Sequence, residues 1–356
     1  MKKLFIVFVA ALLLLGACTQ PLPDDAYVVG FYNVENLFDT EHDRGKNDQA
    51  FTPEGENAWT PDKYDVKLAN IASVIRAMSE RNGRWHVLLG LAEVENDRVL
   101  EDLVAEPALE EAGYRFVHLE GPDVRGIDCA LLYRPDFFQV KETRTLPYDF
   151  NTKSGIVFEK TLEEQREFKT RDVLCVCGEL LGEPTVVYVC HWPSRTGGKG
   201  SDLRCRAAEI VREDILAMEK KYPGINVIVM GDMNDNPEDE CMAVWLHGRE
   251  TIEEMQEGDL FSPFLRMHKD GLGSEEYHGE WNIFDCIFVN GALTDDDEGS
   301  LHILPANDPY YGFIFNPPFL TQQEGRYAGT PFRTFSGGQF VRGYSDHYPT
   351  YIILSK

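Results

Sequence analysis

Eight short apolar runs, rich in β-branched and aromatic residues, recur along the chain and limit its fold more than any other feature. Each run has the length of a β-strand and is bounded by polar, glycine or proline residues. The runs cover residues 27–34, 86–94, 127–133, 172–181, 185–191, 225–230, 282–289 and 348–354. The fourth and fifth runs are joined too tightly for a crossover connection, so they must pair antiparallel.

Two segments between these runs, residues 61–80 and 202–221, have the periodicity of amphipathic helices. Thr60 and Ser201 are the candidate N-caps, and Pro61 suits the first helical position. The apolar stripes consist of Leu68, Ile71, Ile75 and Met78 in the first segment and of Leu203, Ala207, Val211, Ile215 and Met218 in the second. Helices and strands alternate, which predicts an α/β fold of mixed sheets covered by helices.

The N-terminal residues have the pattern of an export signal. Two lysines precede an apolar run that is too short to span a bilayer comfortably. The sequence Leu-Gly-Ala-Cys at 15–18 resembles the bacterial lipobox. We therefore expect a signal peptide over 1–17, a lipidated N-terminus at Cys18 and a tether over 18–26. The expected location is the bacterial cell envelope, lipid-anchored at the outer membrane or the periplasmic face; an ordinary secretory peptide with an incidental cysteine is the alternative.

The remaining chain is acidic and of the size of one large domain. With 43% hydrophobic residues and no low-complexity linker or internal repeat, residues 27–356 are expected to form a single domain that acts as a monomer. Removal of the signal peptide leaves 32 basic and 60 acidic side chains, a net charge of −28. This field repels polyanions at long range, although a bound metal ion can invert the potential locally. The seven cysteines besides Cys18 contain no CxxC pair and imply neither a disulfide framework nor a zinc knuckle.

Polar clusters lie at the ends of the predicted strands, where side chains from separate strands can converge. Each cluster alone is a weak signal, because a lone Gly-Asp or Asp-His is more often a turn or a satisfied hydrogen-bond pair. Five clusters nevertheless occur in order, with one companion acid in the seventh run. They contain Asn33, Glu93, His191, the segment Gly231-Asp232-Met233-Asn234 and the segment Ser345-Asp346-His347, and the companion is Asp285.

This order of residues resembles the endonuclease/exonuclease/phosphatase superfamily, whose fold is that of deoxyribonuclease I, over nearly the whole chain after the tether. The signature of that superfamily is an Asn in the first strand, a Glu in the second motif, Gly-Asp-x-Asn and a terminal Ser-Asp-His. The resemblance implies a four-layer sandwich of two mixed β-sheets flanked by helices. It also implies a site for Mg²⁺, or Mn²⁺, at one end of the sheets.

Hydrolysis of a phosphate ester requires a positioned water, a base, charge neutralisation and help for the leaving oxygen. His347 is the candidate base, and Asp285 would hydrogen-bond its second ring nitrogen and fix its tautomer. Asp232 and Asn234 would orient the water and the phosphate. His191 would donate a hydrogen bond to the phosphoryl or leaving-group oxygen, the role that the resemblance assigns to the corresponding histidine.

Candidate ligands for the cation and the phosphate complete the expected site. Glu93 would hold the divalent cation with Asp346 and Asn33 nearby, and water would fill the shell, since Mg²⁺ takes few protein carboxylates. Arg195, in the turn after the third cluster, is the candidate phosphate-binding arginine together with Asn234.

Other charged residues near the clusters are weaker candidates, to which no role is assigned. The helical periodicity puts Arg204 and Arg206 on the exposed face of the second helix. Four acids that flank the clusters are expected to be solvated, as acids on the loops of so acidic a chain usually are. They are Glu35, Glu95, Asp128 and Asp235. The long polar loop 40–59, in contrast, is expected to overhang the site and help to select the substrate.

Several functions share this set of residues. A nonspecific nuclease comes first, because it needs only a metal site and a modest phosphate grip, so nucleic acid is the expected substrate. A lipid or inositol phosphate phosphoesterase, sphingomyelinase-like, is the alternative; the residues after Asp285 lack the Asp-Arg typical of inositol phosphatases. A sugar-phosphate or other small-molecule phosphoesterase is third. A noncatalytic binding protein is last, because both histidines and all the expected acids are present.

Overall fold

The computed structural model describes residues 22–195, 200–277, 279–297, 299–306 and 309–356. The expected signal peptide, Cys18 and most of the tether lie outside these residues. Within the described part of the chain, no helix combines the length and the apolar character that a membrane crossing needs.

Two seven-stranded mixed sheets form the centre of the molecule. The first has the order β14-β18-β1-β2-β4-β3, with β15 also paired to β18. Its β1 and β2 are parallel, and the other pairs are antiparallel. The strands are β1 (Ala26–Leu37), β2 (Leu88–Val94), β3 (Arg115–His118), β4 (Asp128–Tyr133), β14 (His302–Ile303), β15 (Gly312–Ile314) and β18 (Thr350–Ser355).

The second sheet has the order β5-β6-β7-β8-β13-β10-β9. The pairs β7–β8 and β9–β10 are parallel, and the others are antiparallel. The antiparallel pairing of β6 with β7 confirms the prediction made from their tight connection. The strands are β5 (Phe138–Leu146), β6 (Val173–Leu180), β7 (Glu183–His191), β8 (Asn226–Asp232), β9 (Gly248–Arg249), β10 (Leu260–Phe261) and β13 (Asp285–Asn290).

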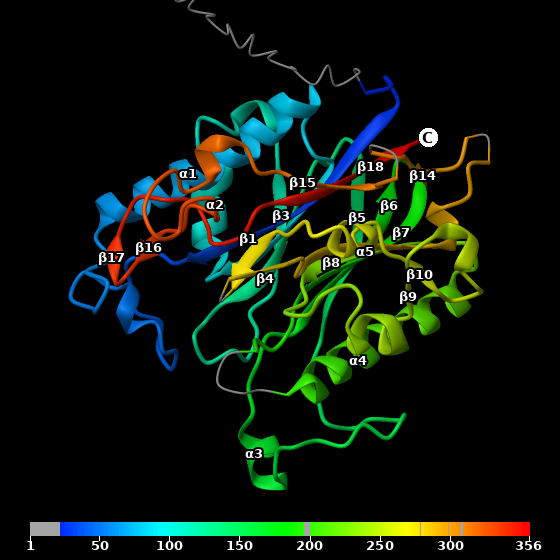
Figure 1. The fold of residues 1–356 in the computed structure, drawn as a ribbon, viewed down its shortest axis with the longest axis horizontal. Coiled ribbons are helices and arrows are strands. Elements are labelled where there is room, and N and C mark those ends of the chain that lie inside the picture. Colours follow the sequence, from blue (N-terminus) through cyan, green and yellow to red (C-terminus); the bar gives the residue numbers. More distant parts are fainter. Residues whose placement is uncertain (1–21, 196–199, 278, 298, 307–308) are drawn as a thin grey trace, which may run out of the picture.

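Helices cover the outer faces of the sheets and complete the four-layer sandwich. In Figure 1, α1 and α2 lie together over the sheet of β1, and α4 lies on the opposite side of the molecule. Thr60 is the N-cap of α1, as expected, whereas α4 begins one residue early, with Gly200 as its N-cap. The helices are α1 (Pro61–Asn82), α2 (Asp97–Val104), α3 (Leu162–Glu167), α4 (Ser201–Lys221) and α5 (Leu265–Lys269).

Strand alternation divides the apolar side chains between two cores. In β1, Val29 and Phe31 face the second sheet, and Val28 and Tyr32 face α1. Such alternation follows from the period of two in a strand and lets one strand line both cores. All nine side chains of the predicted helix stripes are buried, which confirms the sequence prediction for both helices.

Two short hairpins lie outside the two large sheets. They are β11 (Glu275–Tyr277) with β12 (Glu280–Asn282), and β16 (Phe335–Ser336) with β17 (Gln339–Phe340). No predicted strand corresponds to β16 and β17, because two-residue strands carry no detectable period.

Candidate active site

Neighbouring strands bring three of the predicted site residues together directly. In the parallel pair β7–β8, His191 is the register partner of Asp232, and in the antiparallel pair β8–β13, Asp285 is the register partner of the same Asp232. Asp232 therefore lies between His191 and Asp285, at one end of the central strands of the second sheet.

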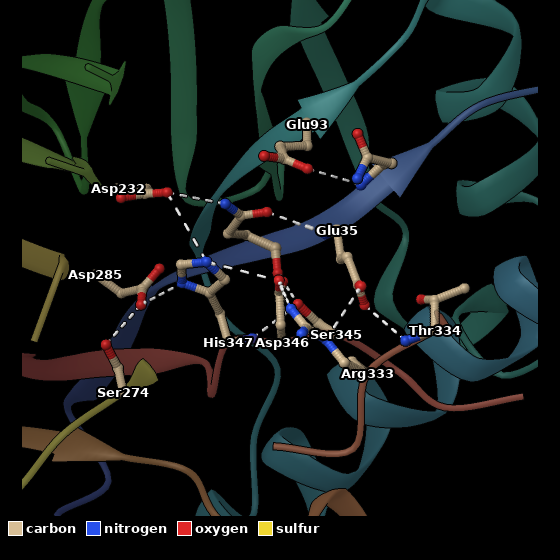
Figure 2. A network of polar contacts seen from close by, with 12 residues as sticks. Glu35, Glu93, Asp232, Ser274, Asp285, Arg333, Thr334, Ser345, Asp346 and His347 are labelled. Carbon is tan, nitrogen blue, oxygen red and sulfur yellow. Dashed lines mark hydrogen bonds and ion pairs between the residues drawn. The ribbon is translucent and has the colours of Figure 1, made fainter. Parts of the chain in front are cut away.

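His347 reaches this edge from the segment before β18. Its Nδ1 lies 2.8 Å from Oδ2 of Asp285, which also accepts a 2.6 Å hydrogen bond from the hydroxyl of Ser274. Figure 2 shows this chain of contacts leading toward Asp232, whose Oδ2 is 4.0 Å from Nε2 of His347. Burial alone would lower the pKa of His347, but Asp285, Glu275 and Asp232 outweigh it and raise the pKa well above its usual value. The ring is thus oriented by a buried carboxylate and turns its other nitrogen to the site.

Asp232 is the most connected acid of the site. Its Oδ2 accepts a 3.0 Å hydrogen bond from Nδ2 of Asn33 and lies 3.6 Å from Nε2 of His191. Its Oδ1 accepts from the backbone N–H of Asn234 at 2.9 Å. Burial raises the pKa of Asp232 to about 6, although the positive charge of His347 opposes this.

Glu93 extends from the end of β2 into the same space. Its Oε2 accepts the backbone N–H of Asn36 at 2.9 Å, and its Oε1 lies 3.8 Å from Nε2 of His191. Among the described residues, no lysine or arginine lies within ion-pair distance of this carboxylate. A carboxylate that faces a cavity without a paired cation fits a divalent metal ion. Mg²⁺ suits a site with so few protein oxygens, because it keeps most of its ligands as water.

The other two predicted metal ligands have protein partners. Oδ1 of Asn33 accepts the backbone N–H of Glu35 at 3.0 Å, so both ends of the amide are used and Asn33 holds Asp232 rather than lining the cavity. Asp346 lines the cavity, and its Oδ2 is 2.5 Å from Nη2 of Arg333. Burial would raise the pKa of Asp346, but His347 and Arg333 outweigh it and lower the pKa.

The structure does not bring Arg195 to the site. Its guanidinium pairs with Asp235 at 2.7 Å and with Asp239 at 2.6 Å, donates to the backbone carbonyl of Asn234 and stacks on Phe284. Arg195 is also absent from the lining of the cavity. It instead fixes the loop that carries Asn234, whose side chain donates to the carbonyl of Trp192. The sequence places Arg195 near His191, but it does not reveal that Arg195 forms ion pairs with two acids.

Two expectations about the remaining charged residues are wrong. Arg204 and Arg206 are buried, because the helix face that carries them is covered by loops that supply Asp235 at 2.8 Å and Asp149 at 2.8 Å. The four flanking acids expected to be solvated are buried as well. They are Glu35, Glu95, Asp128 and Asp235.

A network behind Asp346 was not predicted from the sequence. Glu35 accepts the backbone N–H of Thr334 at 2.6 Å and lies 3.8 Å from Arg333. Lys67, fully buried in α1, donates to the hydroxyl of Thr334 at 2.5 Å. Figure 2 shows Glu35, Arg333 and Thr334 grouped beside Asp346. Burial raises the pKa of Glu35 to about 7 and lowers that of Lys67 to about 8. A lysine on the sheet-facing side of a helix was the one sequence signal that could have indicated this network.

A cavity of about 1380 Å³ opens over these residues. Its floor includes Glu93, His191, Asp232 and His347. Its walls come from residues 275–277 and 279 and from residues between 322 and 346. The loop 40–59 contributes nothing to the lining, contrary to expectation, because its Phe51 packs against Phe38 and Phe335 on another side of the β16–β17 hairpin.

The fold and this site define a class of enzyme, the two-sheet sandwich hydrolases in which a histidine–aspartate pair and carboxylates meet at one edge of the sheets. Residues 28–356 match the model of the Endonuclease/Exonuclease/phosphatase family, and the chain belongs to that family, whose members hydrolyse phosphoesters. This confirms the resemblance drawn from the sequence. No curated protein matches the chain significantly.

Solved structures share the fold at low sequence identity. An endonuclease/exonuclease/phosphatase family protein from Bacteroides thetaiotaomicron is 16% identical, with a TM-score of 0.54, over 92% of this chain and 97% of that one. TDP2 from D. rerio, complexed with a single-strand DNA product, is 15% identical, with a TM-score of 0.53, over 94% of this chain and all of that one. A mannosyl-6-phosphatase from Bacteroides thetaiotaomicron is 16% identical, with a TM-score of 0.52, over 93% and 100%.

Proposed function

We propose that this protein is an exported, metal-dependent phosphoester hydrolase in which His347 activates water. The observation that carries the proposal is the buried chain Ser274–Asp285–His347, which turns Nε2 of His347 toward Asp232. Nε2 of His347 and Oδ2 of Asp232 are 4.0 Å apart, so a single water molecule can hydrogen-bond to both. His347 would take the proton of that water, and Asp285 would stabilise the resulting imidazolium.

The remaining residues bind and polarise the phosphate. Glu93 and Asp346 would hold a divalent cation, Mg²⁺ or Mn²⁺, which when bound neutralises charge on the phosphoryl oxygens. His191 would donate a hydrogen bond from Nε2 to the phosphoryl or leaving-group oxygen. Asn234, held by its bond to the carbonyl of Trp192, would position the phosphate.

Single-stranded nucleic acid is the first candidate substrate, with the protein acting as a nonspecific nuclease. Two exposed tyrosines, Tyr277 and Tyr327, line the cavity, and the guanidinium of Arg326 lies 5.5 Å from the ring of Tyr327. Exposed aromatic rings beside a cation can stack bases and hold the backbone without reading sequence. The likeness to TDP2 bound to a single-strand DNA product is consistent with this choice.

A small phosphate ester, such as a sugar phosphate, is the second candidate. The acidity of the cavity favours it, since an extended polyanion meets more repulsion there than a single phosphate does. Among the described residues, the lining contains the carboxylates Glu93, Asp232, Glu275, Glu276, Glu324 and Asp346 but only the arginines Arg125, Arg326 and Arg333.

A substrate panel with added metal tests both candidates. The panel contains single-stranded and plasmid DNA, RNA, sphingomyelin, phosphoinositides, sugar phosphates and nitrophenyl phosphates, with Mg²⁺, Mn²⁺ or EDTA. We expect EDTA to abolish turnover and Glu93→Gln to lower it on every substrate, and full turnover after chelation would exclude the metal mechanism.

Tyr327→Ala distinguishes the two candidates. If bases stack on this ring, the variant loses roughly tenfold or more in activity on single-stranded DNA, since stacking contributes about 1–3 kcal/mol per base. Its activity on nitrophenyl esters stays unchanged. Tyr222→Ala is the matched control, because Tyr222 is similarly exposed but does not line the cavity. Preference for sugar phosphates with no effect of Tyr327→Ala on any substrate would favour the second candidate.

We also propose that the protein is anchored in the cell envelope by a lipid on Cys18. The sequence Leu-Gly-Ala-Cys at 15–18 supports this. Cys18→Ser should block incorporation of labelled fatty acid and release the protein from membranes. Unchanged labelling in that variant would exclude the anchor.

A further inference from the structure

A second group of carboxylates lies outside the catalytic cavity, where the loop after β1 meets the end of β2. Asp43, Asp48 and Glu95 each offer an oxygen there, and these atoms all lie within 4.8 Å of one another. None of the three residues lines the cavity. The group is therefore distinct from the site of Glu93, although Glu95 is only two residues further along the chain.

Two of these three carboxylates are buried. Asp48 and Glu95 each keep 2% of their surface exposed. Oε2 of Glu95 accepts the backbone N–H of Asp39 at 2.7 Å, whereas Oε1 is buried and has no hydrogen-bond partner among the described residues. Burial of a carboxylate oxygen without a hydrogen-bond partner costs free energy. A cation bound between this oxygen and the two neighbouring carboxylates would offset that cost.

The protein itself supplies little positive charge to this group. Among the described residues, no lysine or arginine forms an ion pair with Asp43, Asp48 or Glu95. Asp48 contacts Nδ1 of His42 through Oδ1 and accepts the backbone N–H of Asp43 at 2.7 Å through Oδ2. The nearby ammonium of Lys46 points to the carbonyls of residues 121 and 123 instead.

We propose that Asp43, Asp48 and Glu95 bind a structural Ca²⁺ ion. The donor set consists of oxygens from an irregular loop and a strand end, and Ca²⁺ accepts such ligands in flexible geometry with water completing the shell. Structural Zn²⁺ sites are built from Cys and His, whereas all three acids of this group offer oxygen, and Mg²⁺ demands a nearly regular octahedron. The bound ion would fasten the loop 40–59 to the end of β2.

This fastening would support the cavity from outside. Phe51 of the same loop stacks on Phe38 with ring centroids 4.3 Å apart and makes an edge contact with Phe335 of the β16–β17 hairpin. Ser336 of that hairpin lines the cavity. The ion would thus order a loop that supports one wall of the cavity without itself contacting substrate.

Thermal unfolding in a calcium titration tests the proposal. The purified protein is stripped with EDTA, returned to millimolar MgCl₂ so that a Mg²⁺-type site is filled, and titrated with CaCl₂. We expect the Tm to rise by about 4 °C when calcium reaches one hundred times its Kd. Glu95→Gln and Asp48→Asn should abolish the rise. Glu41→Gln, which changes an exposed acid of the same loop, and Glu93→Gln should both retain it.

Further measurements keep the result interpretable if a variant is weakened. In EDTA, Glu95→Gln should unfold near the Tm of the unaltered protein, because glutamine keeps an oxygen that can accept the N–H of Asp39. Calorimetric titration of the unaltered protein in excess Mg²⁺ should give one Ca²⁺ per chain. The proposal is overturned by the absence of any calcium response in the unaltered protein, or by a response that persists in Glu95→Gln. It is equally overturned if Glu93→Gln abolishes the calcium response. A second group of possible ligands, His118, Glu120 and Asp128, lies nearby; loss of the response in Asp128→Asn but not in Glu95→Gln would place the calcium there instead.

Discussion

Replacement of Asp285 by Asn should show how much of the effect of Asp285 on His347 comes from its negative charge, because asparagine has nearly the same shape but no charge. Asp285 is fully buried and accepts from both His347, at 2.8 Å, and Ser274, at 2.6 Å. Asparagine fills the same space and keeps one acceptor, but it removes the nearest of the negative charges that raise the pKa of His347. If His347 is the base, it must be neutral to act, so the reaction rate rises as the pH rises through this pKa.

The size of the expected shift follows from the geometry of the pair. Two unit charges whose centres lie about 4 Å apart interact with about 4 kcal/mol at an effective dielectric constant of 20, equivalent to about 3 pH units. Glu275 and Asp232 remain in Asp285→Asn and keep part of the effect. The acidic limb of the kcat/KM profile should therefore move by about 2 pH units toward acid. The maximal kcat should fall by roughly 10² or more, because the imidazole loses its orienting charge.

The assay is the pH profile of hydrolysis of a nitrophenyl phosphate ester, recorded for both proteins at saturating metal. Ser274→Ala is the matched control, since it removes a hydrogen bond to Asp285 but no charge, and its acidic limb should stay within about half a pH unit of the original. An acidic limb that does not move in Asp285→Asn, whatever happens to kcat, would refute the assignment of His347 as the titrating base.

Stability gives an independent readout of the same pair. The pKa of His347 is raised in the folded protein, so its charge contributes stability that is fully present below the unfolded value of about 6.5 and is lost as the pH rises through the folded pKa. Metal-free protein should accordingly lose stability in that alkaline window. Asp285→Asn should flatten the loss, as measured by denaturant unfolding at several pH values.

Three further predictions concern stability. His86 is fully buried and its folded pKa is lowered to about 3 by burial, so unfolding takes up a proton below pH 6.5. Stability should fall by about 2 kcal/mol between pH 6.5 and 4.5, and His86→Leu should remove that slope in denaturant titrations. Arg204→Ala should destabilise by about 1.5–3 kcal/mol, because Asp235 loses one buried partner but keeps Arg195, whereas a change near zero would mean that the buried pair contributes nothing to stability. Gly231→Ala should lower the free energy of unfolding by about 1–3 kcal/mol or more, because the added Cβ would lie 2.2 Å from the backbone carbonyl oxygen of Cys190. An unchanged free energy of unfolding would mean that β7 and β8 can move apart at no cost.

Sequence patterns predicted the helices, the strands and the α/β class because period and connection length are local properties, whereas the four layers were implied by the family resemblance. The helix stripes, the antiparallel β6–β7 pair and the α/β class all follow from spacing alone. The order of strands within each sheet does not, since register partners such as Asp285 and Asp232 are 53 residues apart, as their numbers show. The polar residues at strand ends could be recognised only because several motifs occur together in a known order.

Charged residues were predicted less well because their surroundings are not periodic. The periodicity of α4 indicates which side of the helix faces the sheet, but it carries no information about loops that return to cover the other side. Asp149 and Asp235 come from two such loops and bury Arg206 and Arg204. Arg195 fails as a predicted phosphate ligand for the same reason, since proximity in sequence to His191 does not reveal a competing acid.

The end of β2 shows how one backbone irregularity separates two carboxylates that a regular strand would keep together. In an unbroken strand, Glu93 and Glu95 would point to the same face. The register shifts between Ala92 and Val94, however, and Glu93 has a left-handed φ of 65°. Glu93 consequently faces the cavity, and Glu95 lies with the loop acids. For a residue other than glycine, this conformation costs about 1–3 kcal/mol and persists only where the surroundings enforce it.

Hydrogen bonds to the two carboxylates enforce this conformation. Oε2 of Glu93 accepts the N–H of Asn36 at 2.9 Å, and Oε2 of Glu95 accepts the N–H of Asp39 at 2.7 Å. Asn36 itself has a left-handed φ of 60°, so the ends of β1 and β2 leave the regular sheet together. Each carboxylate therefore uses one oxygen to hold the end of β1 or the loop that follows it, and its other oxygen is the one that we propose binds a cation. Because both acids fasten the same turn, a cation bound by Glu95 would restrict the backbone that positions Glu93.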